Sequence, residues 1–362
     1  NMIFSKFDMY ALESFKNNLS LAKIQAWFFP IILFLIGLSN ILVIYIGGRE
    51  YINGEIDIGV IAEFIIYVNM LTWPVTLVGW VTSIIKQAEA SQKRINEFID
   101  SKSSLKNGNL KIKKSEIDNI VFKNVSFSYK QTEIKIFDSF DLHIKKGQNI
   151  GIIGKVGSGK TSLLDLISRI YDPDEGDILI GNKNIKLLKL SELRRIISYV
   201  PQDVFLFSES IRKNIQFGNP SATKDEVLKA ASLSEINEEI IKFKEGYDTI
   251  LGERGVTLSG GQAQRLSIAR SFIKDAEIYL FDDCFSSLDS DTEIKILDNL
   301  KNTFTTKTLI IVSHRISCIK NADKIIVFEN GKVIQSGNHN ELINRQGYYK
   351  ELFKKQNSEI NN

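Results

Sequence analysis

The first hundred residues contain two long apolar stretches separated by a short polar segment. Residues 24–48 and residues 64–85 carry no charged side chain. Each is long enough to cross the ~30 Å hydrocarbon core of a bilayer as a helix. We therefore expect two spanning helices, over about residues 24–48 and 60–85, preceded by an amphipathic helix over residues 1–25. The alternative is a pair of long buried helices in a soluble protein.

The charges around these stretches predict their orientation. Residues 47–57 between them are polar and mostly acidic, whereas Lys16 and Lys23 precede the first stretch and Lys86 and Lys93 follow the second. Because basic residues stay on the cytoplasmic side, both outer ends should face the cytoplasm and the connecting turn should face outward. A lone two-helix hairpin is too small to enclose a transport pathway, so further helices must come from missing sequence or from partners.

Two prolines interrupt the apolar stretches. Pro30 lies near the start of the first stretch, and we expect it in the first turn of the helix, where a proline has no hydrogen bond to lose. Pro74 lies inside the second stretch, where neighbouring helices can satisfy the backbone groups that it frees.

The pattern changes after the second stretch. Residues 86–100 continue as a polar helix, and residues 101–118 are rich in Ser, Lys, Asn and Gly, which is typical of a linker. From residue 119 to residue 356, short apolar runs alternate with helical periodicity. This alternation predicts an α/β domain with a largely parallel core sheet.

A glycine-rich loop lies between a predicted strand at residues 149–153 and a predicted helix at residues 162–167. Its sequence fits G-x-x-x-x-G-K-[ST], the phosphate-binding loop. The glycines let backbone N–H groups approach a polyphosphate, and the helix N-terminus adds positive potential. Lys160 can reach the β- and γ-phosphates, and the Thr161 hydroxyl can bind Mg²⁺. The candidate nucleotide-binding residues here are Gly154, Lys155, Val156, Gly157, Ser158, Gly159, Lys160, Thr161 and Ser162.

A second apolar run, residues 278–281, ends in Asp282 and Asp283. Ligands of α/β sheets bind at the carboxyl ends of the strands, so Asp282 is placed to hold Mg²⁺. Taken alone, the same pattern also fits a core strand that ends in a solvated acidic turn.

The third motif is Leu-Ser-Gly-Gly-Gln at residues 258–262, followed by helical periodicity over residues 263–274. This motif is the signature of ATP-binding cassette (ABC) proteins, which the chain resembles over essentially its whole length. The resemblance implies an ABC-type ATPase domain with a helical subdomain, preceded by an all-α transmembrane helix pair. It also implies that two such domains close head-to-tail over two nucleotides. The residues that would face the γ-phosphate held by the opposite subunit are Ser259, Gly260, Gly261 and Gln262.

Four more residues acquire expected roles from the resemblance. Tyr129 matches the aromatic residue that stacks on adenine, although a tyrosine on a sheet surface is the alternative. Gln202 matches the glutamine that contacts Mg²⁺ and senses the membrane domain. Asp289 lies in the Ser-Leu-Asp loop that couples the two sites, and His314 resembles the histidine that contacts the γ-phosphate.

The membrane part resembles the last two spanning helices of an ABC exporter half-transporter. Such half-transporters carry more spanning helices than this pair, so the chain resembles a C-terminal fragment of one. The expected partners are a second half-transporter, the lipid bilayer and a transported substrate of unknown identity. The expected cofactors are ATP and Mg²⁺.

One residue departs from the family pattern. The residue after the magnesium aspartate is usually glutamate, the general base for the attacking water, and here it is Asp283. General-base catalysis contributes on the order of 10²–10⁴-fold, and a shorter side chain could lose much of it. We favour a heterodimer in which this chain's own site is weak. A homodimer that uses Asp283 as a slow base stays open, as does a regulatory subunit without turnover. The candidate catalytic residues are Asp283, His314 and Gln202.

Net charge and cysteine content narrow the classes of protein to which the chain can belong. A net charge of +3 gives no support for nucleic-acid binding. Cys284 and Cys318 lack metal-ligand spacing, and they suggest a reducing cytosol around the nucleotide-binding half. We expect a multi-pass protein of the plasma membrane. The spanning pair argues against an ABC ATPase that acts on DNA or ribosomes.

Overall fold

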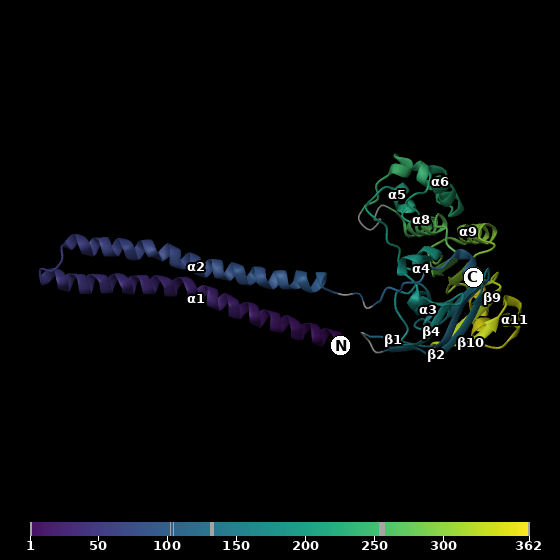
Figure 1. Ribbon diagram of the computed structural model, residues 1–362, viewed down its shortest axis with the longest axis horizontal. Coiled ribbons are helices and arrows are strands. Elements are labelled where there is room, and N and C mark those ends of the chain that lie inside the picture. Colours follow the sequence, from purple (N-terminus) through teal and green to yellow (C-terminus); the bar gives the residue numbers. More distant parts are fainter. Residues whose placement is uncertain (1, 102, 104, 131–133, 253–257, 361–362) are drawn as a thin grey trace. The chain divides into compact units, whose positions relative to one another are not determined.

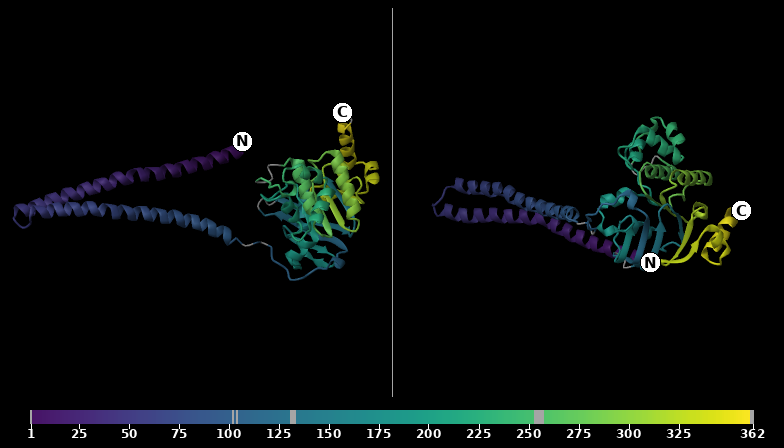
Figure 2. Two further views of the ribbon diagram at one scale, coloured as in Figure 1. Left: turned by 90° about the horizontal axis from the view of Figure 1, so that it is seen from above. Right: turned by 45° about the vertical axis from the view of Figure 1, so that its right-hand side comes forward.

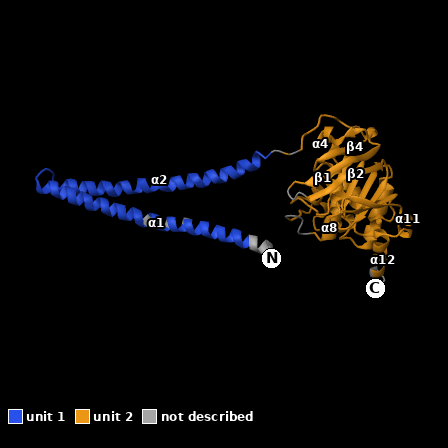
Figure 3. Ribbon diagram, turned by 90° about the horizontal axis from the view of Figure 1, so that it is seen from below, with its two compact units in different colours: residues 1–102 blue, residues 103–362 orange. Residues whose placement is uncertain are grey.

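The chain is described by a computed structural model over residues 2–101, 103, 105–130, 134–252 and 258–360. It divides into two compact units, residues 1–102 and residues 103–362, which Figure 3 colours separately.

The first unit is a hairpin of two long helices, α1 (Met2–Ile52) and α2 (Ile58–Ile99) (Figure 1). Both are long and apolar enough to cross a membrane, by length and composition. No residue of α2 is buried, and large apolar side chains such as Phe34 and Trp73 are about 70% exposed. The helices therefore lack the burial expected of core helices in a soluble protein.

Two details of the predicted hairpin were wrong. The connecting turn is shorter than residues 47–57, because α1 continues through Gly47 and Gly48 to Ile52. Gly47 lies so close to α2 that a Cβ there would be 2.8 Å from Ile61 Cγ1, so glycine permits close helix contact at this point. Pro30 lies in the interior of α1, because the predicted amphipathic helix and the first apolar stretch form one continuous helix.

The second unit contains two sheets (Figures 1 and 2). The smaller sheet is antiparallel, with the strand order β2–β1–β4–β5. The sequence pattern predicted the parallel core sheet but not this antiparallel sheet. Its strands are β1 (Asn119–Tyr129), β2 (Ile134–Lys145), β4 (Glu175–Ile180) and β5 (Lys183–Asn184).

The larger sheet has the order β10–β9–β3–β8–β7–β6, and all its neighbours are parallel except β10 and β9. In the central register, Ile152 lies between Val312 and Ile326. The predicted parallel core is therefore confirmed. Its strands are β3 (Asn149–Gly154), β6 (Ile197–Val200), β7 (Ile278–Asp282), β8 (Thr308–Val312), β9 (Lys324–Glu329) and β10 (Lys332–Gly337).

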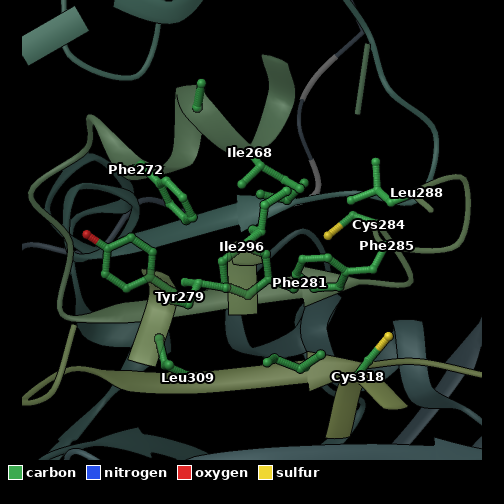
Figure 4. Close-up of a cluster of buried hydrophobic side chains, with 14 of the residues drawn as sticks. Ile268, Phe272, Tyr279, Phe281, Cys284, Phe285, Leu288, Ile296, Leu309 and Cys318 are labelled. Carbon is green, nitrogen blue, oxygen red and sulfur yellow. The ribbon is translucent and has the colours of Figure 1, made fainter. Parts of the chain in front are cut away.

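Both faces of the parallel sheet are covered. Alternate side chains of β7 enter different hydrophobic clusters: Tyr279 and Phe281 join one, and Leu280 joins the other. The first cluster packs beneath the helices, and Figure 4 shows Ile268 and Phe272 of α8 over the side chains of β7. Burial on both faces explains why these strands are almost wholly apolar.

The helices that follow the strands form the rest of the unit. In Figures 1 and 2, α5, α6 and α8 lie in a lobe away from β1, β2 and β4, as the predicted helical subdomain requires. The α-helices are α3 (Lys160–Ile167), α4 (Leu190–Ile196), α5 (Ile211–Gln216), α6 (Lys224–Leu233), α7 (Asn237–Lys242), α8 (Gly260–Phe272), α9 (Ser290–Thr303), α10 (Ile316–Ile319), α11 (His339–Asn344) and α12 (Tyr348–Ile360). The short 3₁₀ helices are η1 (Lys114–Glu116), η2 (Ile185–Leu187) and η3 (Gly246–Asp248).

Part of the segment expected to be a linker belongs to the second unit and packs within it. Leu110 forms a β-bridge with Leu188, and the side chains of Ile112 and Ile117 are each 1% exposed.

Candidate functional site

A cavity of about 220 Å³ lies where β3, β7 and β8 end. This is the carboxyl edge of the parallel sheet, where α/β folds bind their ligands. The cavity brings together most of the residues that the motifs singled out, although they come from distant parts of the sequence. Its lining residues are Tyr129, Ile136, Val156, Gly157, Ser158, Gly159, Lys160, Thr161, Ser162, Gln202, Asp282, Asp283, Val312 and His314.

The loop between β3 and α3 needs its glycines. Gly157 and Gly159 have φ values of 78° and 99°, in the left-handed region that favours glycine. At Gly154 a Cβ would lie 2.2 Å from the Phe328 carbonyl oxygen. The Ser158 hydroxyl is buried and has no hydrogen-bond partner within the described chain. The Ser158 hydroxyl lies beside the N-terminus of α3, whose first N–H groups have no partner within the helix. Together they can donate hydrogen bonds to the oxygen atoms of a phosphate chain.

Lys160 is held at the base of this loop. Its ammonium donates hydrogen bonds to the Gly154 and Lys155 carbonyl oxygens, at 2.9 and 2.8 Å, and its side chain is 6% exposed. Burial lowers the pKa of Lys160, while the nearby carboxylates of Asp282 and Asp283 raise it. A partly desolvated cation in a cavity attracts a polyphosphate more strongly than a surface lysine does.

Asp282 ends β7 and is 2% exposed. Burial raises its pKa, although a hydrogen bond from Thr161 favours the ionised form. Thr161 and Gln202 line the same cavity, so hydroxyl, amide and carboxylate oxygens are available together. Such oxygen ligands suit Mg²⁺, which usually keeps several waters and is shared with substrate phosphates. The residues present therefore fit a magnesium ion brought in with a nucleotide.

Asp283 is held in an unusual conformation. Its φ is 45°, and its N–H donates to the Val312 carbonyl oxygen at 2.9 Å. Its carboxylate oxygen Oδ1 accepts a hydrogen bond from the backbone N–H of His314 at 3.2 Å. Asp283 thus ties the end of β7 to the segment after β8, and both its carboxylate and the His314 side chain border the cavity.

Tyr129 lies at the border of the cavity beside Ile136. Its hydroxyl is 2.9 Å from the Ser162 hydroxyl oxygen, which places it over the start of α3. Edge-on contacts with Phe127 and Tyr171, with ring centroids 5.0 and 5.4 Å away, fix the ring. A fixed aromatic ring at this position can stack on a flat base.

The signature residues do not line the cavity. Ser259 caps α8, where its hydroxyl accepts from the Gln262 N–H at 3.2 Å and its own N–H donates to the Gln262 side chain at 2.9 Å. Ser259 and Gly260 are exposed, and a Cβ at Gly260 would meet no atom within 4 Å. At Gly261, a Cβ would lie 3.1 Å from the Ser287 carbonyl oxygen. Asp289 also lies outside the cavity and caps α9 through the Thr292 N–H at 2.9 Å.

Two residues that no motif predicted lie beside Asp282. The Tyr199 hydroxyl on β6 is 3.3 Å from carboxylate oxygens of both Asp165 and Asp282. Burial raises the pKa of Asp165 to about 6. No motif marks Asp165 or Tyr199, and they meet only because β6 pairs with β7 beside α3.

Comparisons with known proteins find relatives among ABC transporters. Residues 137–286 match the family model described as "ABC transporter". The chain is 36% identical over 351 residues to the "Multidrug resistance-like ATP-binding protein MdlA" of Escherichia coli (strain K12), covering 96% of this chain and 59% of that protein. It is 33% identical over 351 residues to the "Probable multidrug resistance ABC transporter ATP-binding/permease protein YheI" of Bacillus subtilis (strain 168), covering 97% of this chain and 60% of that protein.

A solved structure shares the fold. The "Structure of a bacterial Atm1-family ABC exporter with ATP bound" superposes with a TM-score of 0.74 at 31% identity, covering 96% of this chain and 60% of that one. The chain thus spans about 60% of the length of the proteins it matches.

Proposed function

We propose that this chain, which belongs to the ABC transporter family, is one half of an ATP-driven exporter. The cavity carries the proposal, because it places Lys160, Asp282 and His314 around one space together with the unpartnered hydroxyl of Ser158. Lys160 and the N-terminus of α3 would hold the phosphates of ATP, and Tyr129 would stack on its base. When bound, Mg²⁺ would neutralise phosphate charge, held by Thr161, Gln202 and Asp282.

The membrane part of the proposal places α1 and α2 across the plasma membrane, with the nucleotide-binding domain in the cytoplasm. The apolar length of both helices and the basic residues at their outer ends support this orientation. Closing and opening of paired nucleotide domains would then drive the spanning helices between inward- and outward-facing arrangements. Gln202 lines the cavity at its border and would report its state to the membrane domain.

The signature supports a head-to-tail dimer. Gly260 starts α8, is exposed and has open space around it within this chain, as a surface that meets a partner's phosphate would require. The N–H groups at this helix terminus would bind the γ-phosphate held by the second half-transporter.

We propose further that the partner is a different half-transporter with the stronger hydrolytic site. The Asp283 carboxylate is already bonded to the His314 N–H, and it is one methylene shorter than the glutamate usual in the family. Both features make it a poor base for an attacking water. A homodimer that uses Asp283 slowly and a subunit without turnover are the alternatives, and substitutions at residue 283 distinguish the homodimer from the heterodimer.

One experiment tests nucleotide use and orientation together. Sealed lipid vesicles containing the transporter, with a cysteine at Asn53→Cys, should hydrolyse ATP added outside, and chelating Mg²⁺ should abolish hydrolysis. The transporters that use external ATP should hold position 53 inside the vesicle, because Asn53 lies in the turn between α1 and α2. A membrane-impermeant maleimide should therefore label that cysteine only after detergent is added.

Two results would contradict the proposal. Hydrolysis that persists without Mg²⁺ would show that the site does not need the metal. Labelling of position 53 in intact vesicles, in the population that hydrolyses external ATP, would reverse the topology. A cysteine at Asn357→Cys, on exposed α12, is the matched control and should be labelled without detergent.

A further inference from the structure

The short segment that begins with His314 is held by one side chain from the far end of the chain. Gln356 on α12 donates a hydrogen bond from Nε2 to the His314 carbonyl oxygen at 2.7 Å. Its Oε1 accepts a hydrogen bond from the Ile316 N–H at 2.9 Å. A single amide therefore spans residue 315 and fixes the backbone on both sides of it.

The opposite side of the same segment is also held. The Arg315 guanidinium lies 2.8 Å from the carboxylate of Glu293, which is fully buried on α9. Arg315 also donates to the Leu288 carbonyl oxygen at 3.2 Å, in the loop before α9. With the bond from the His314 N–H to Asp283, contacts from α9 and from the segment between β7 and α9 also constrain where His314 can lie.

The helix that carries Gln356 is itself well anchored. Tyr349, two turns earlier on α12, is fully buried, and its hydroxyl is 2.7 Å from Nδ1 of His339 on α11. Leu352 and Phe353 pack against the core cluster beneath the helices. Residues four and seven positions apart share one face of a helix, so Gln356 lies on the anchored face of α12.

We infer that Gln356 is a positioning residue, which holds His314 at the phosphate end of the cavity through its backbone. Gln356 lies 70 positions beyond residues 137–286, which match the family model, so that match gives it no role. The inference rests on the proposed function, in which His314 contacts the γ-phosphate. Only ATP has that phosphate, so positioning of His314 should set the preference for ATP over ADP.

The measurement is photolabelling of this chain by 8-azido-ATP in the assembled transporter, competed with Mg-ATP or Mg-ADP. The readout is the ratio of the Kd for ADP to the Kd for ATP at this chain's own site. Gln356→Met keeps the length of the side chain but removes both hydrogen bonds, and it should lower the ratio roughly three- to tenfold. Asn357→Met, at the exposed neighbouring position, is the matched control and should leave the ratio unchanged.

A double-mutant cycle separates positioning from a general structural effect. His314→Ala alone should lower the ratio, and adding Gln356→Met to it should lower it no further. Gln356→Glu, which keeps the acceptor for Ile316 but turns a carboxylate oxygen toward the His314 carbonyl, should resemble Gln356→Met and serves if that variant folds poorly. A wild-type ratio in both Gln356 variants, or an equal further loss in the His314→Ala background, would overturn the inference.

The outcomes also distinguish this inference from the proposed function. If His314→Ala lowers the ratio and the Gln356 variants do not, only the role of Gln356 falls. If ATP does not compete with the photolabel in the wild-type chain, the nucleotide site itself is wrong and both fall.

Discussion

Replacing Gly260 by aspartate is expected to abolish most ATPase activity of the assembled transporter, although this chain's own phosphate loop stays intact. In the proposed head-to-tail dimer, the new carboxylate would stand where the γ-phosphate held by the partner lies. Two unit charges about 4 Å apart repel by about 4 kcal/mol at an effective dielectric of about 20, which corresponds to roughly a thousandfold loss. The measurement is ATP hydrolysis by the reconstituted transporter.

The surroundings of Gly260 allow this substitution without disturbing the fold. A Cβ at Gly260 meets no atom of the described residues within 4 Å, and an acidic side chain in the first turn of α8 is favourable for the helix. Loss of folding is therefore not the expected cause of lost activity. Gly260→Ala adds the Cβ without the charge and should keep most of the activity. Aspartate and alanine variants of equal activity would show that no phosphate approaches this residue.

Replacing Lys160 by alanine is expected to lower the affinity of this chain for ATP by about 10- to 100-fold, the range for hydrogen bonds to a charged group. The lysine is buried and aimed into the cavity by two carbonyl oxygens, so no neighbouring surface charge can replace it. Tyr129→Ala should cost less, about fivefold, because it removes stacking worth on the order of 1 kcal/mol. Competition of 8-azido-ATP labelling by ATP measures both.

A control for these two variants is available on β2. His143 is exposed, lies outside the nucleotide cavity and matches no motif, so His143→Ala should leave ATP affinity unchanged. Wild-type affinity in both Lys160→Ala and Tyr129→Ala would refute the assignment of the cavity as a nucleotide site.

The parts of the site that could be predicted from sequence are those encoded by consecutive residues. The glycines between β3 and α3 adopt the left-handed region because of their own residue type. The apolar run of β7 that ends in Asp282 likewise forms a strand because of its own sequence. The parallel sheet then brings these strand ends together, because parallel neighbours share a carboxyl edge. Local patterns were therefore sufficient to predict the phosphate loop and Asp282, whereas His314 was predicted from the resemblance to ABC proteins.

The contacts that could not be predicted join residues far apart in sequence. Tyr199 on β6 meets Asp165 on α3, and Gln356 on α12 reaches His314. Neither contact is marked by a hydrophobic periodicity or by a motif spacing in the sequence. The antiparallel sheet was also missed, because the alternation in β1 and β2 does not say which strands they pair with.

The continuation of α1 through Gly47 and Gly48 has a similar explanation. Glycines commonly indicate a turn, but here a close approach to Ile61 of α2 uses the absence of a side chain within a helix. Packing between α1 and α2 therefore overrides the preference of glycine for turns. The sequence of α1 alone does not show this packing.

In the proposed heterodimer, this chain's own site binds ATP but turns it over slowly, because Asp283 is a poor base. Asp283→Asn tests it most directly. Asparagine keeps an oxygen to accept the His314 N–H and tolerates the positive φ of 45°, so it removes the carboxylate charge while preserving the local geometry. The matched variant Asp283→Glu restores the reach of a base and should raise hydrolysis at this site.

The deciding measurement is ATP hydrolysis by the assembled transporter with Asp283→Asn, compared with wild type and with Gly260→Asp. We predict that Asp283→Asn retains nearly wild-type activity, because little base catalysis is left to lose, whereas Gly260→Asp loses most of it. If Asp283→Asn removes activity as completely as Gly260→Asp, then Asp283 is a working catalytic base and the weak-site heterodimer is contradicted.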